Sequence, residues 1–372
     1  MKIVLAPDSF KGCLRSPEIC DALREGILSV RPDAEVISVP MADGGEGSTE
    51  AVLKAAGGEL RTVTVRGPLG KPVEASFALL NDKRSAVLEM AAASGIELLS
   101  NDELNPLLAS TFGTGELLRA ALDAGAREII MGIGGSATVD GGAGFIQALG
   151  VKLLDCEGND LPGGGGTLAR LDKLIVSGLD PRLRETRLRI ACDVTNPLLG
   201  ERGAASVFGP QKGASPVMVE ELESNLVHYA ETLKKSGLVA NSSQPGDGAA
   251  GGLGFALRVF CGAEMVSGAR LLAEITHLQE KMRDADLVIT GEGCTDGQTS
   301  SGKLCSVIAE LAREENVPVI LLSGALKGDL PGMHETFTAA FSISTGPSSL
   351  SEALPSARKN LFFAARNIAR LL

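Results

Sequence analysis

The stretch Arg127-Glu-Ile-Ile-Met-Gly-Ile-Gly-Gly-Ser-Ala-Thr-Val-Asp-Gly-Gly-Ala-Gly144 decides how the fold is interpreted. Its first five residues predict a buried β-strand, and residues 132–144 then form a glycine loop. Because glycine reaches positive φ without a Cβ clash, such a loop brings backbone N–H groups close to a ligand. Unpaired N–H groups at a helix start favour anions, above all phosphate. The alternative is a tight turn that packs small residues against a helix.

The composition is typical of a large α/β protein. The chain has 372 residues, of which 46 are glycine, none is tryptophan and one is tyrosine, so we expect an aliphatic core and glycine-built loops. This length favours two or three domains. The net charge of −11 argues against nucleic acid or a membrane surface as a partner, because both attract basic proteins. Any anionic ligand is therefore expected to be bound by individual groups at its site and not attracted by the overall charge of the protein.

The cysteines and the first apolar run bear on the cellular location. The seven cysteines are scattered and include no C-x-x-C pair, so neither a disulfide framework nor a structural zinc site is expected. The apolar run over residues 2–6 is too short for a signal sequence or a membrane span. We therefore expect the protein in a reducing cytoplasm.

Hydrophobic periodicity divides the chain into two outer segments and a middle one. The outer segments alternate helices with short apolar strands, expected at residues 2–6, 35–39, 287–290, 317–322 and 338–343. In the middle segment, apolar runs separated by tight turns are typical of a mixed or antiparallel sheet. We therefore predict a doubly wound parallel α/β domain from residues 1–60 and 282–372, with a mixed α/β domain, residues 61–281, inserted into it.

One part of the middle segment is ambiguous. The pattern predicts a helix over residues 216–235, and the Gly- and Ala-rich stretch 244–252 follows it. That stretch is consistent either with a flexible linker or with a second loop that approaches another part of the chain closely.

Polar residues follow several of the predicted strands. In open α/β sheets, ligands bind outside the carboxyl ends of the strands. Asp8 and Lys11 follow the first strand, and Asp43 and Glu46 follow the second. We therefore take these side chains as candidates for ligand binding.

The glycine loop also fits a dinucleotide-binding pattern. Residues 132–137 match G-x-G-x-x-A, and Asp155 stands near the position of a ribose-binding acid, so a NAD-dependent 2-hydroxy-acid dehydrogenase is an alternative. Against it, the expected helix would contain Gly141, Gly142 and Gly144, each costing about 1 kcal/mol relative to alanine.

A second glycine motif has the spacing of a P-loop. Residues 297–303 fit G-x-x-x-x-G-K, but Leu304 stands where a hydroxyl should bind Mg²⁺. Lys303, beside Ser300 and Ser301 at a predicted helix start, is still placed to hold an anion. A solvated surface lysine is the alternative.

The available side chains favour phosphoryl transfer over hydrolysis. Only three histidines exist, and none lies in a loop rich in Gly or Asp, so a Ser/His/Asp triad is disfavoured. Phosphoryl transfer needs positioning, carboxylates for Mg²⁺, and cations on the phosphate. The loop acids available as metal ligands or bases are Asp8, Asp43, Asp140, Asp193 and Asp296. Each is also a residue type that turns favour.

Six motifs occur in order along the chain. They are Ala6-Pro-Asp-Ser-Phe-Lys-Gly12, Ala42-Asp-Gly-Gly-Glu-Gly47, Gly132-Ile-Gly-Gly-Ser-Ala-Thr138, Ala191-Cys-Asp-Val-Thr-Asn-Pro197, Phe208-Gly-Pro-Gln-Lys-Gly213 and Asp286-Leu-Val-Ile-Thr-Gly-Glu-Gly293. Together they strongly resemble the motifs of the bacterial glycerate kinases of the type-1 family, and the likeness covers essentially the whole chain.

The resemblance implies a fold and a reaction. It implies ATP-dependent phosphorylation of D-glycerate, giving 2-phosphoglycerate, by Mg²⁺-assisted transfer in a cleft between the two domains. It also implies a flavodoxin-like outer domain and small-molecule partners, with neither nucleic acid nor membrane. A sensor that binds ATP or glycerate without turnover is the non-enzymatic alternative.

The motifs and the strand-end positions together give the expected site. The expected catalytic residues are Lys11 and Asp193, and the expected metal ligands are Asp193 and Glu292. Substrate binding is assigned to Asp8, Ser9, Asp43, Lys212, Asp296 and Lys303. Nucleotide binding is assigned to Gly132, Gly134, Gly135, Ser136 and Thr138.

The chain departs from the family pattern at two positions: the family often has Ser or Glu near Cys13, and the more serious departure is at Cys294. Cys294 stands where the family usually has an arginine. Since an arginine there is a bidentate partner for carboxylate or phosphate, the lysines are expected to carry more of the anion binding.

Overall fold

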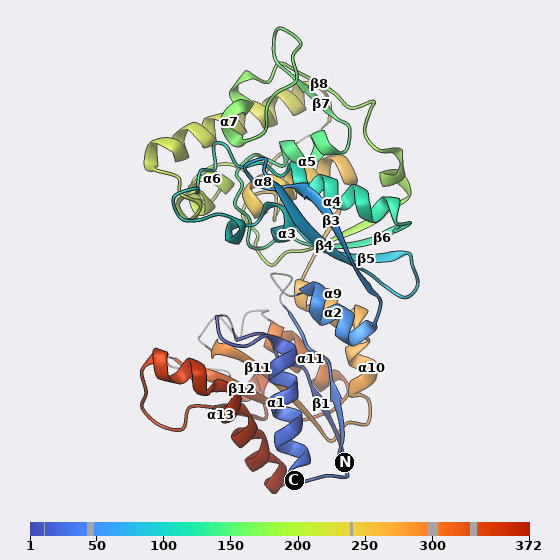
Figure 1. The fold of residues 1–372 in the computed structure, drawn as a ribbon, viewed down its shortest axis with the longest axis vertical. Coiled ribbons are helices and arrows are strands. Elements are labelled where there is room, and N and C mark those ends of the chain that lie inside the picture. Colours follow the sequence, from blue (N-terminus) through green and yellow to red (C-terminus); the bar gives the residue numbers. More distant parts are fainter. Residues whose placement is uncertain (11, 43–47, 239–240, 296–303, 328–332) are drawn as a thin grey trace. The chain divides into compact units, whose positions relative to one another are not determined.

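The computed structural model describes residues 1–10, 12–42, 48–238, 241–295, 304–327 and 333–372, which form two compact units (Figure 1). The first unit contains Met1–Asp43, Glu50–Gly57 and Gly268–Leu372, and the second contains Gly44–Thr49 and Gly58–Ser267. The sequence analysis placed residues 268–281 in the inserted domain. They group with the terminal segments, so we draw the boundary at Gly268.

The first unit consists of one parallel sheet and its helices. Its strands are β1 (Lys2–Leu5), β2 (Glu35–Ser38), β11 (Leu287–Thr295), β12 (Val319–Leu326) and β13 (Ala339–Ser342). Its helices are α1 (Ser16–Leu28), α2 (Ser48–Ala56, whose first two residues group with the second unit), α9 (Gly268–Ile275), α10 (Leu278–Met282), α11 (Leu304–Glu314), α12 (Met333–Thr336) and α13 (Leu350–Leu371).

The strand order of this sheet is β2-β1-β11-β12-β13, with every neighbouring pair parallel. In the unit's own numbering the order is 2-1-3-4-5, which is the flavodoxin-like arrangement, so the predicted fold class is confirmed. The central strands are buried on both faces, which explains why β1 and the first part of β11 are continuous apolar runs.

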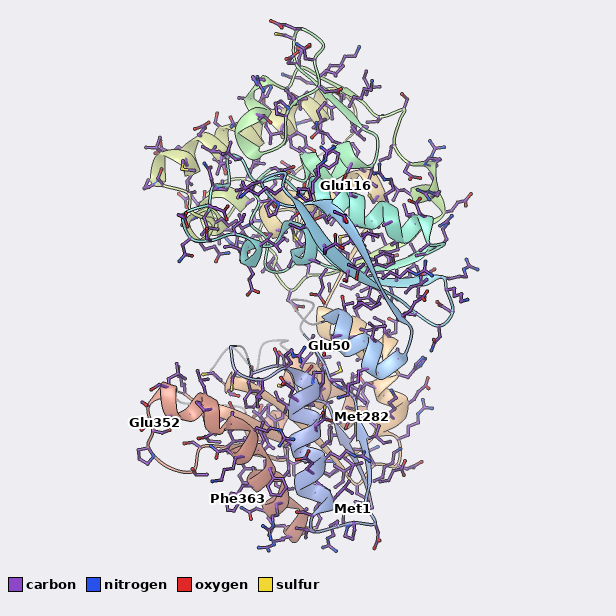
Figure 2. All side chains as sticks on the ribbon, viewed as in Figure 1. Met1, Glu50, Glu116, Met282, Glu352 and Phe363 are labelled. Carbon is purple, nitrogen blue, oxygen red and sulfur yellow. The ribbon has the colours of Figure 1, made fainter. Side chains whose placement is uncertain are left out.

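Helix α13 closes one face of this sheet beside α1 (Figure 1). Its first turn is fixed by a capping box, in which Ser349 Oγ and the Ser349 N–H both interact with the Glu352 carboxylate (Figure 2). Leu361 and Ala365 are fully buried against α1 and the sheet, while Phe363 on the opposite side of the helix is exposed.

The second unit is a mixed α/β structure. Its strands are β3 (Glu59–Arg66), β4 (Pro72–Leu79), β5 (Ser85–Glu89), β6 (Glu128–Gly132), β7 (Lys152–Leu154), β8 (Lys173–Ile175), β9 (Arg187–Ala191) and β10 (Glu264–Val266). Its α-helices are α3 (Ala91–Ser94), α4 (Phe112–Asp123), α5 (Ala143–Ala148), α6 (Ala204–Phe208), α7 (Pro216–Lys235) and α8 (Ala249–Cys261), and its 3₁₀ helices are η1 (Ile96–Leu98), η2 (Gly165–Arg170), η3 (Pro181–Glu185) and η4 (Pro210–Lys212).

The main sheet of this unit has the order β10-β9-β6-β5-β4-β3. Strands β3, β4 and β5 pair antiparallel, as their short turns predict, whereas β5, β6, β9 and β10 pair parallel. The mixed sheet expected here is confirmed. Helix α4 is held to β3 where the Arg66 N–H donates to Glu116 Oε2 at 2.7 Å (Figure 2).

The stretch 244–252 is not a linker. Helix α8 is assigned from Ala249, and Ala250, Gly251 and Gly252 have left-handed φ/ψ values inside it, which kinks its start. The first part of the helix that follows, residues 253–257, is buried. Of the two sequence interpretations, close approach to another part of the chain is therefore correct. No helix in the described ranges is both long enough and apolar enough to span a bilayer.

Candidate functional site

Four parallel strands of the second unit end at one edge of its sheet. Glu89 of β5, Gly132 of β6, Ala191 of β9 and Val266 of β10 lie in one row across the sheet, each register-paired with the next. The segments that leave this row therefore start side by side. They include residues 133–142 of the glycine loop and the Asp193 loop, residues 192–198.

The glycine loop is exposed only at its tip. Gly134 and Gly135 are exposed, whereas residues 136–140 are buried. Gly141, which has a φ of +63°, donates its N–H to the Gly251 carbonyl oxygen at 3.0 Å, so the kinked start of α8 packs against the loop. The packing interpretation is therefore correct for the buried part of the loop, whereas anion binding at its exposed tip stays a prediction.

Lys212 supports this loop from within the protein. Its side chain is 1% exposed, and Nζ lies 2.6 Å from Ser136 Oγ and 2.7 Å from the Thr138 carbonyl oxygen. Burial lowers the pKa of Lys212 to about 7, although the nearby Asp140 carboxylate opposes this shift. The expected role of Lys212 in contacting substrate needs correction, since its ammonium group is occupied by the loop itself.

Asp140 is the other buried charge beneath the loop. It is 0% exposed and accepts hydrogen bonds from the N–H and Oγ1 of Thr111, both at 2.8 Å, and from the N–H groups of Gly142 and Gly144 at 3.1 and 3.3 Å. Burial raises the pKa of Asp140, and these hydrogen bonds act against that shift. Asp140 therefore fixes the start of α5 and is not available as a metal ligand or base.

Gly132 and Thr138 are also less accessible than a nucleotide-binding role requires. Gly132 is the last, buried residue of β6. Thr138 is 0% exposed, and its Oγ1 has no hydrogen-bond partner among the described residues. Of the five residues assigned to nucleotide binding, Gly134 and Gly135 alone are exposed.

The Asp193 loop differs from the glycine loop in its exposure. Asp193, Val194 and Thr195 are exposed directly beyond the end of β9, as the sequence predicts. Burial, and then the negative charge of Asp193, raise the pKa of the neighbouring Cys192 thiol. The carboxylate thus stands beside solvent at the carboxyl end of a strand.

The first unit has its own acidic strand edge. Asp8, after β1, accepts the Ser9 N–H at 2.7 Å, and Glu292, within β11, accepts a hydrogen bond from Thr295 Oγ1 at 2.9 Å. Burial raises the pKa of the Cys305 thiol, and the charges of Glu292 and Asp8 raise it further. The two carboxylates therefore share one environment, as expected for neighbouring parallel strands.

Five candidate residues lie outside the described residues. They are Lys11, Asp43, Glu46, Asp296 and Lys303. The P-loop-like stretch, residues 297–303, lies outside them as well. Cys294, at the position where the related family usually has arginine, is exposed on β11.

The geometry of a dinucleotide fingerprint is not present. That fingerprint needs a helix that starts in the glycine loop, whereas α5 begins only at Ala143. Asp155 lies at the turn after β7, where its carboxylate accepts hydrogen bonds from the N–H groups of Glu157 and Asn159 at 3.0 and 2.9 Å. The hypothesis of a nicotinamide site is therefore wrong.

Among the described residues, no group of three or more His, Cys, Asp or Glu side chains forms a ready-made metal site. Mg²⁺ does not require one, because it is often bound through one or two carboxylates together with substrate phosphates and water. Exposed Asp193 and partly exposed Glu292 each offer such a carboxylate. The donor chemistry therefore fits Mg²⁺ brought with a nucleotide.

The sequence analysis missed Glu89. This residue ends β5 directly beside Gly132 and accepts the Thr49 N–H at 2.6 Å. The signal that could have identified it is an acid placed immediately after the buried run Ala86–Leu88, which is the pattern that identified Asp193.

Comparison with known proteins identifies relatives over the whole chain. The sequence profile described as the glycerate kinase family matches residues 3–372. The glycerate 2-kinase of Escherichia coli K12 is 48% identical over 373 residues, covering 100% of this chain and 98% of that protein. The glycerate kinase of Bacillus subtilis 168 is 46% identical, covering 99% and 97%. A crystal structure of a protein assigned as glycerate kinase 2, from Salmonella typhimurium LT2, superimposes with a TM-score of 0.90 at 46% identity, covering 100% and 98%.

Proposed function

The chain belongs to the glycerate kinase family, and on that premise we propose that it transfers the γ-phosphoryl group of ATP to D-glycerate, giving 2-phosphoglycerate. The observation that carries the proposal is the family match, which spans residues 3–372. The proposal includes Mg²⁺ as the cofactor, small-molecule substrates as partners, with neither nucleic acid nor membrane, and a cytoplasmic location.

We assign the nucleotide phosphates to the exposed tip of the glycine loop. Gly134 and Gly135 have no Cβ, so an anion can approach their backbone N–H groups closely. Ser136 and Thr138 serve beneath the tip, where Lys212 holds them. This arrangement binds phosphate through a backbone that is already ordered before the ligand arrives.

Asp193 is assigned as the base. The glycerate hydroxyl is a weak nucleophile near neutral pH, and a carboxylate within hydrogen-bond reach assists its attack. The proton moves from the hydroxyl to a carboxylate oxygen of Asp193 as the new O–Pγ bond forms. The bond between Pγ and the oxygen bridging to Pβ breaks, and ADP leaves with that oxygen.

Mg²⁺, when bound, neutralises charge on the β- and γ-phosphate oxygens. Asp193 and Glu292 are the residues that would hold it, each through its carboxylate. Asp8 and Ser9 are assigned to the hydroxyl groups of glycerate. The lysines Lys11 and Lys303 supply the cations for its carboxylate and for the transferring phosphate.

The test is a three-component incubation of the purified protein with ATP, Mg²⁺ and D-glycerate. ADP release is expected only when all three are present. ADP release that does not depend on glycerate contradicts the proposal. Thermal stabilisation by ATP or glycerate with no ADP formed would identify a sensor instead.

The position of phosphorylation is tested on the same product by phosphorus NMR. A phosphate on the secondary oxygen has one proton on the adjacent carbon, so the proton-coupled signal is a doublet. A phosphate on the primary oxygen has two such protons, and a triplet would overturn the assignment to 2-phosphoglycerate.

A further inference from the structure

Residues 241–248 form a segment, called here the strap, that connects to the start of α8. Asp247 in the strap is 0% exposed and forms a bidentate ion pair with Arg258 of α8, with Nε–Oδ1 at 2.7 Å and an Arg258 terminal nitrogen to Oδ2 at 2.8 Å. Arg258 also donates to the Asn241 carbonyl oxygen at 3.2 Å, and the Gln244 N–H donates to Asp247 Oδ2 at 2.9 Å. A single arginine therefore holds both ends of the strap.

The strap in turn holds the Asp193 loop. The Gly248 N–H donates to the Asn196 carbonyl oxygen at 2.9 Å, and the Leu198 N–H donates to the Ser242 carbonyl oxygen at 3.3 Å. A Cβ on Gly248 would collide with the Pro197 carbonyl oxygen, so the two backbones are in close contact. The loop that carries Asp193 is thus paired with the strap over its second half.

The same helix also contacts the glycine loop. The Gly251 carbonyl oxygen accepts the Gly141 N–H, and a Cβ on Gly251 would collide with the Thr138 carbonyl oxygen. Helix α8 therefore touches the glycine loop directly and reaches the Asp193 loop through the strap. Because β6 and β9 are adjacent strands, the loops start side by side, and α8 fixes how they continue.

We propose that Arg258 is a positioning residue for phosphoryl transfer, acting through the strap to set the Asp193 carboxylate relative to the tip of the glycine loop. The inference rests on the proposed function, in which those two loops hold the base and the nucleotide. Misplacement of a reacting group by about 1 Å costs about 10²-fold in rate, and it weakens the chemical step more than substrate binding.

The first experiment compares Arg258→Gln with the wild type at a temperature where both are folded. We expect kcat to fall by at least about tenfold, with KM for ATP and glycerate within about threefold. Arg258→Lys keeps the charge but loses the bidentate geometry, so its kcat should lie between that of the wild type and that of Arg258→Gln. Unchanged kcat in folded Arg258→Gln would overturn the inference.

A double-variant cycle separates positioning from general loss of structure. If Arg258 acts through Asp193, Arg258→Gln should change kcat by less than about twofold in an Asp193→Asn background. The same tenfold loss in both backgrounds would show that Arg258 does not act on Asp193.

A matched control is available in the same unit. Arg182 forms a bidentate ion pair with Asp180, with Nε–Oδ1 at 3.0 Å and the second contact at 2.7 Å, at the start of η3. Arg182→Gln removes this bidentate ion pair, together with the contact of Arg182 with Asp123 at 2.6 Å, and neither pair holds either loop. This variant should lower the melting temperature without lowering kcat, and a kcat loss equal to that of Arg258→Gln contradicts the proposal.

Hydrogen exchange gives a readout that does not depend on activity. The amides of Leu198 and Gly248 should exchange at least about tenfold faster in Arg258→Gln and be unchanged in Arg182→Gln. If Arg258→Gln does not fold, Asp247→Asn/Arg258→Gln avoids the unpaired buried charge and is measured instead. If the amides of Leu198 and Gly248 exchange at the wild-type rate in Arg258→Gln, the inference is overturned. If they exchange faster but the wild-type protein has no kinase activity, the result contradicts the proposed function and not the role of Arg258 in holding the strap.

Discussion

The glycine loop and the Asp193 loop leave adjacent strands of one sheet, yet their polar side chains have opposite surroundings. In the glycine loop, Thr138 and Asp140 are fully buried, and only the glycine tip is exposed. In the Asp193 loop, the acid itself is exposed and the backbone behind it is held by the strap. The same residue type, an aspartate after a buried strand, thus serves the fold in one loop and faces solvent in the other.

This difference teaches that position at a strand end does not by itself make an acid a site candidate, because one such acid is buried and the other is exposed. Asp140 accepts four hydrogen bonds from its surroundings, three of them from backbone N–H groups. Buried carboxylates satisfied in this way stabilise local structure and are costly to leave unpaired. The glycine loop is called here the packed loop, and the Asp193 loop the open loop. The variants below measure whether residues of the packed loop affect stability and residues of the open loop affect catalysis.

The largest expected effect comes from the open loop. Asp193→Asn should lower kcat by about 10² to 10⁴, because asparagine neither accepts the proton nor binds Mg²⁺ as well. Its melting temperature should stay close to that of the wild type, since the side chain is exposed. Steady-state kinetics and thermal unfolding measure both quantities.

Asp155→Asn is the matched control for this variant. Asp155 is a partly exposed aspartate whose carboxylate accepts hydrogen bonds within a turn, and it lies at the β7–β8 end of the unit. Its replacement should leave kcat within about twofold. Full activity of Asp193→Asn would leave only a turn-forming role for Asp193.

The next effect is on the stability of the packed loop. Gly251 has a φ of +68°, and a Cβ there would collide with the Thr138 carbonyl oxygen. Gly251→Ala should therefore lower the free energy of unfolding by at least about 3 kcal/mol, combining left-handed strain with backbone displacement.

Gly200, at the end of the segment beyond the Asp193 loop, separates these two contributions. It has a φ of +90°, and a Cβ added there would meet no described atom within 4 Å, so Gly200→Ala should cost only the strain of about 1 to 2 kcal/mol. Denaturant unfolding of both variants measures the difference. Equal losses would show that the contact between α8 and the glycine loop adds nothing to stability.

The third effect is a pH dependence caused by Lys212. Its folded pKa is lowered to about 7, so between pH 7 and about 10 the unfolded state binds more protons than the folded state. The contribution of Lys212 to stability therefore rises with pH in that window. The free energy of unfolding of the wild type should gain about 2 kcal/mol relative to Lys212→Met from pH 7 to pH 9.

Lys71→Met is the control for this measurement. Lys71 is exposed, and its hydrogen bond and ion pair with Glu103 raise its pKa, so it stays protonated in both the folded and the unfolded state from pH 7 to pH 9 and its contribution to stability should not change in that window. Urea unfolding at the two pH values gives both differences. A Lys212→Met difference that falls with pH would mean that the lysine stays charged beneath the loop.

The sequence predicted those parts of the fold that depend on local pattern. The helix expected over 216–235 is observed as α7 with the same bounds, because Ser215 caps it, Pro216 starts it and its apolar positions repeat at helical spacing. The strand β11 was placed from its apolar run, but it continues to Thr295 because pairing with β12 extends beyond that run.

The parts that depend on contacts between distant residues were missed. Ala250, Gly251 and Gly252 begin α8 with left-handed conformations, and no helix propensity predicts a start that is stabilised by contacts with residues distant in the chain. Lys212 was expected to contact substrate, whereas its partners lie 76 and 74 residues away in the chain. The sequence thus predicted which residues lie near a strand end, but not which groups their side chains contact.

The smallest expected effect tests the least accessible residue of the packed loop. Thr138 Oγ1 is buried without a hydrogen-bond partner among the described residues, so the hydroxyl contributes a desolvation cost and no compensating bond. Thr138→Val keeps the shape of the side chain and removes that oxygen. The free energy of unfolding should change by less than about 1 kcal/mol, with any gain on the side of the variant.

Thr114→Val provides the contrast, because Thr114 is equally buried but its Oγ1 donates to Ser94 Oγ at 2.8 Å. Its replacement should cost about 1 to 2 kcal/mol. In kinetics, KM for ATP should stay within about twofold for Thr138→Val, since only the glycine tip is exposed to bind phosphate. A tenfold rise in that KM would mean that the Thr138 side chain contacts the nucleotide. The distinction between a packed loop and an open loop would then be wrong at Thr138, the least accessible residue of the packed loop.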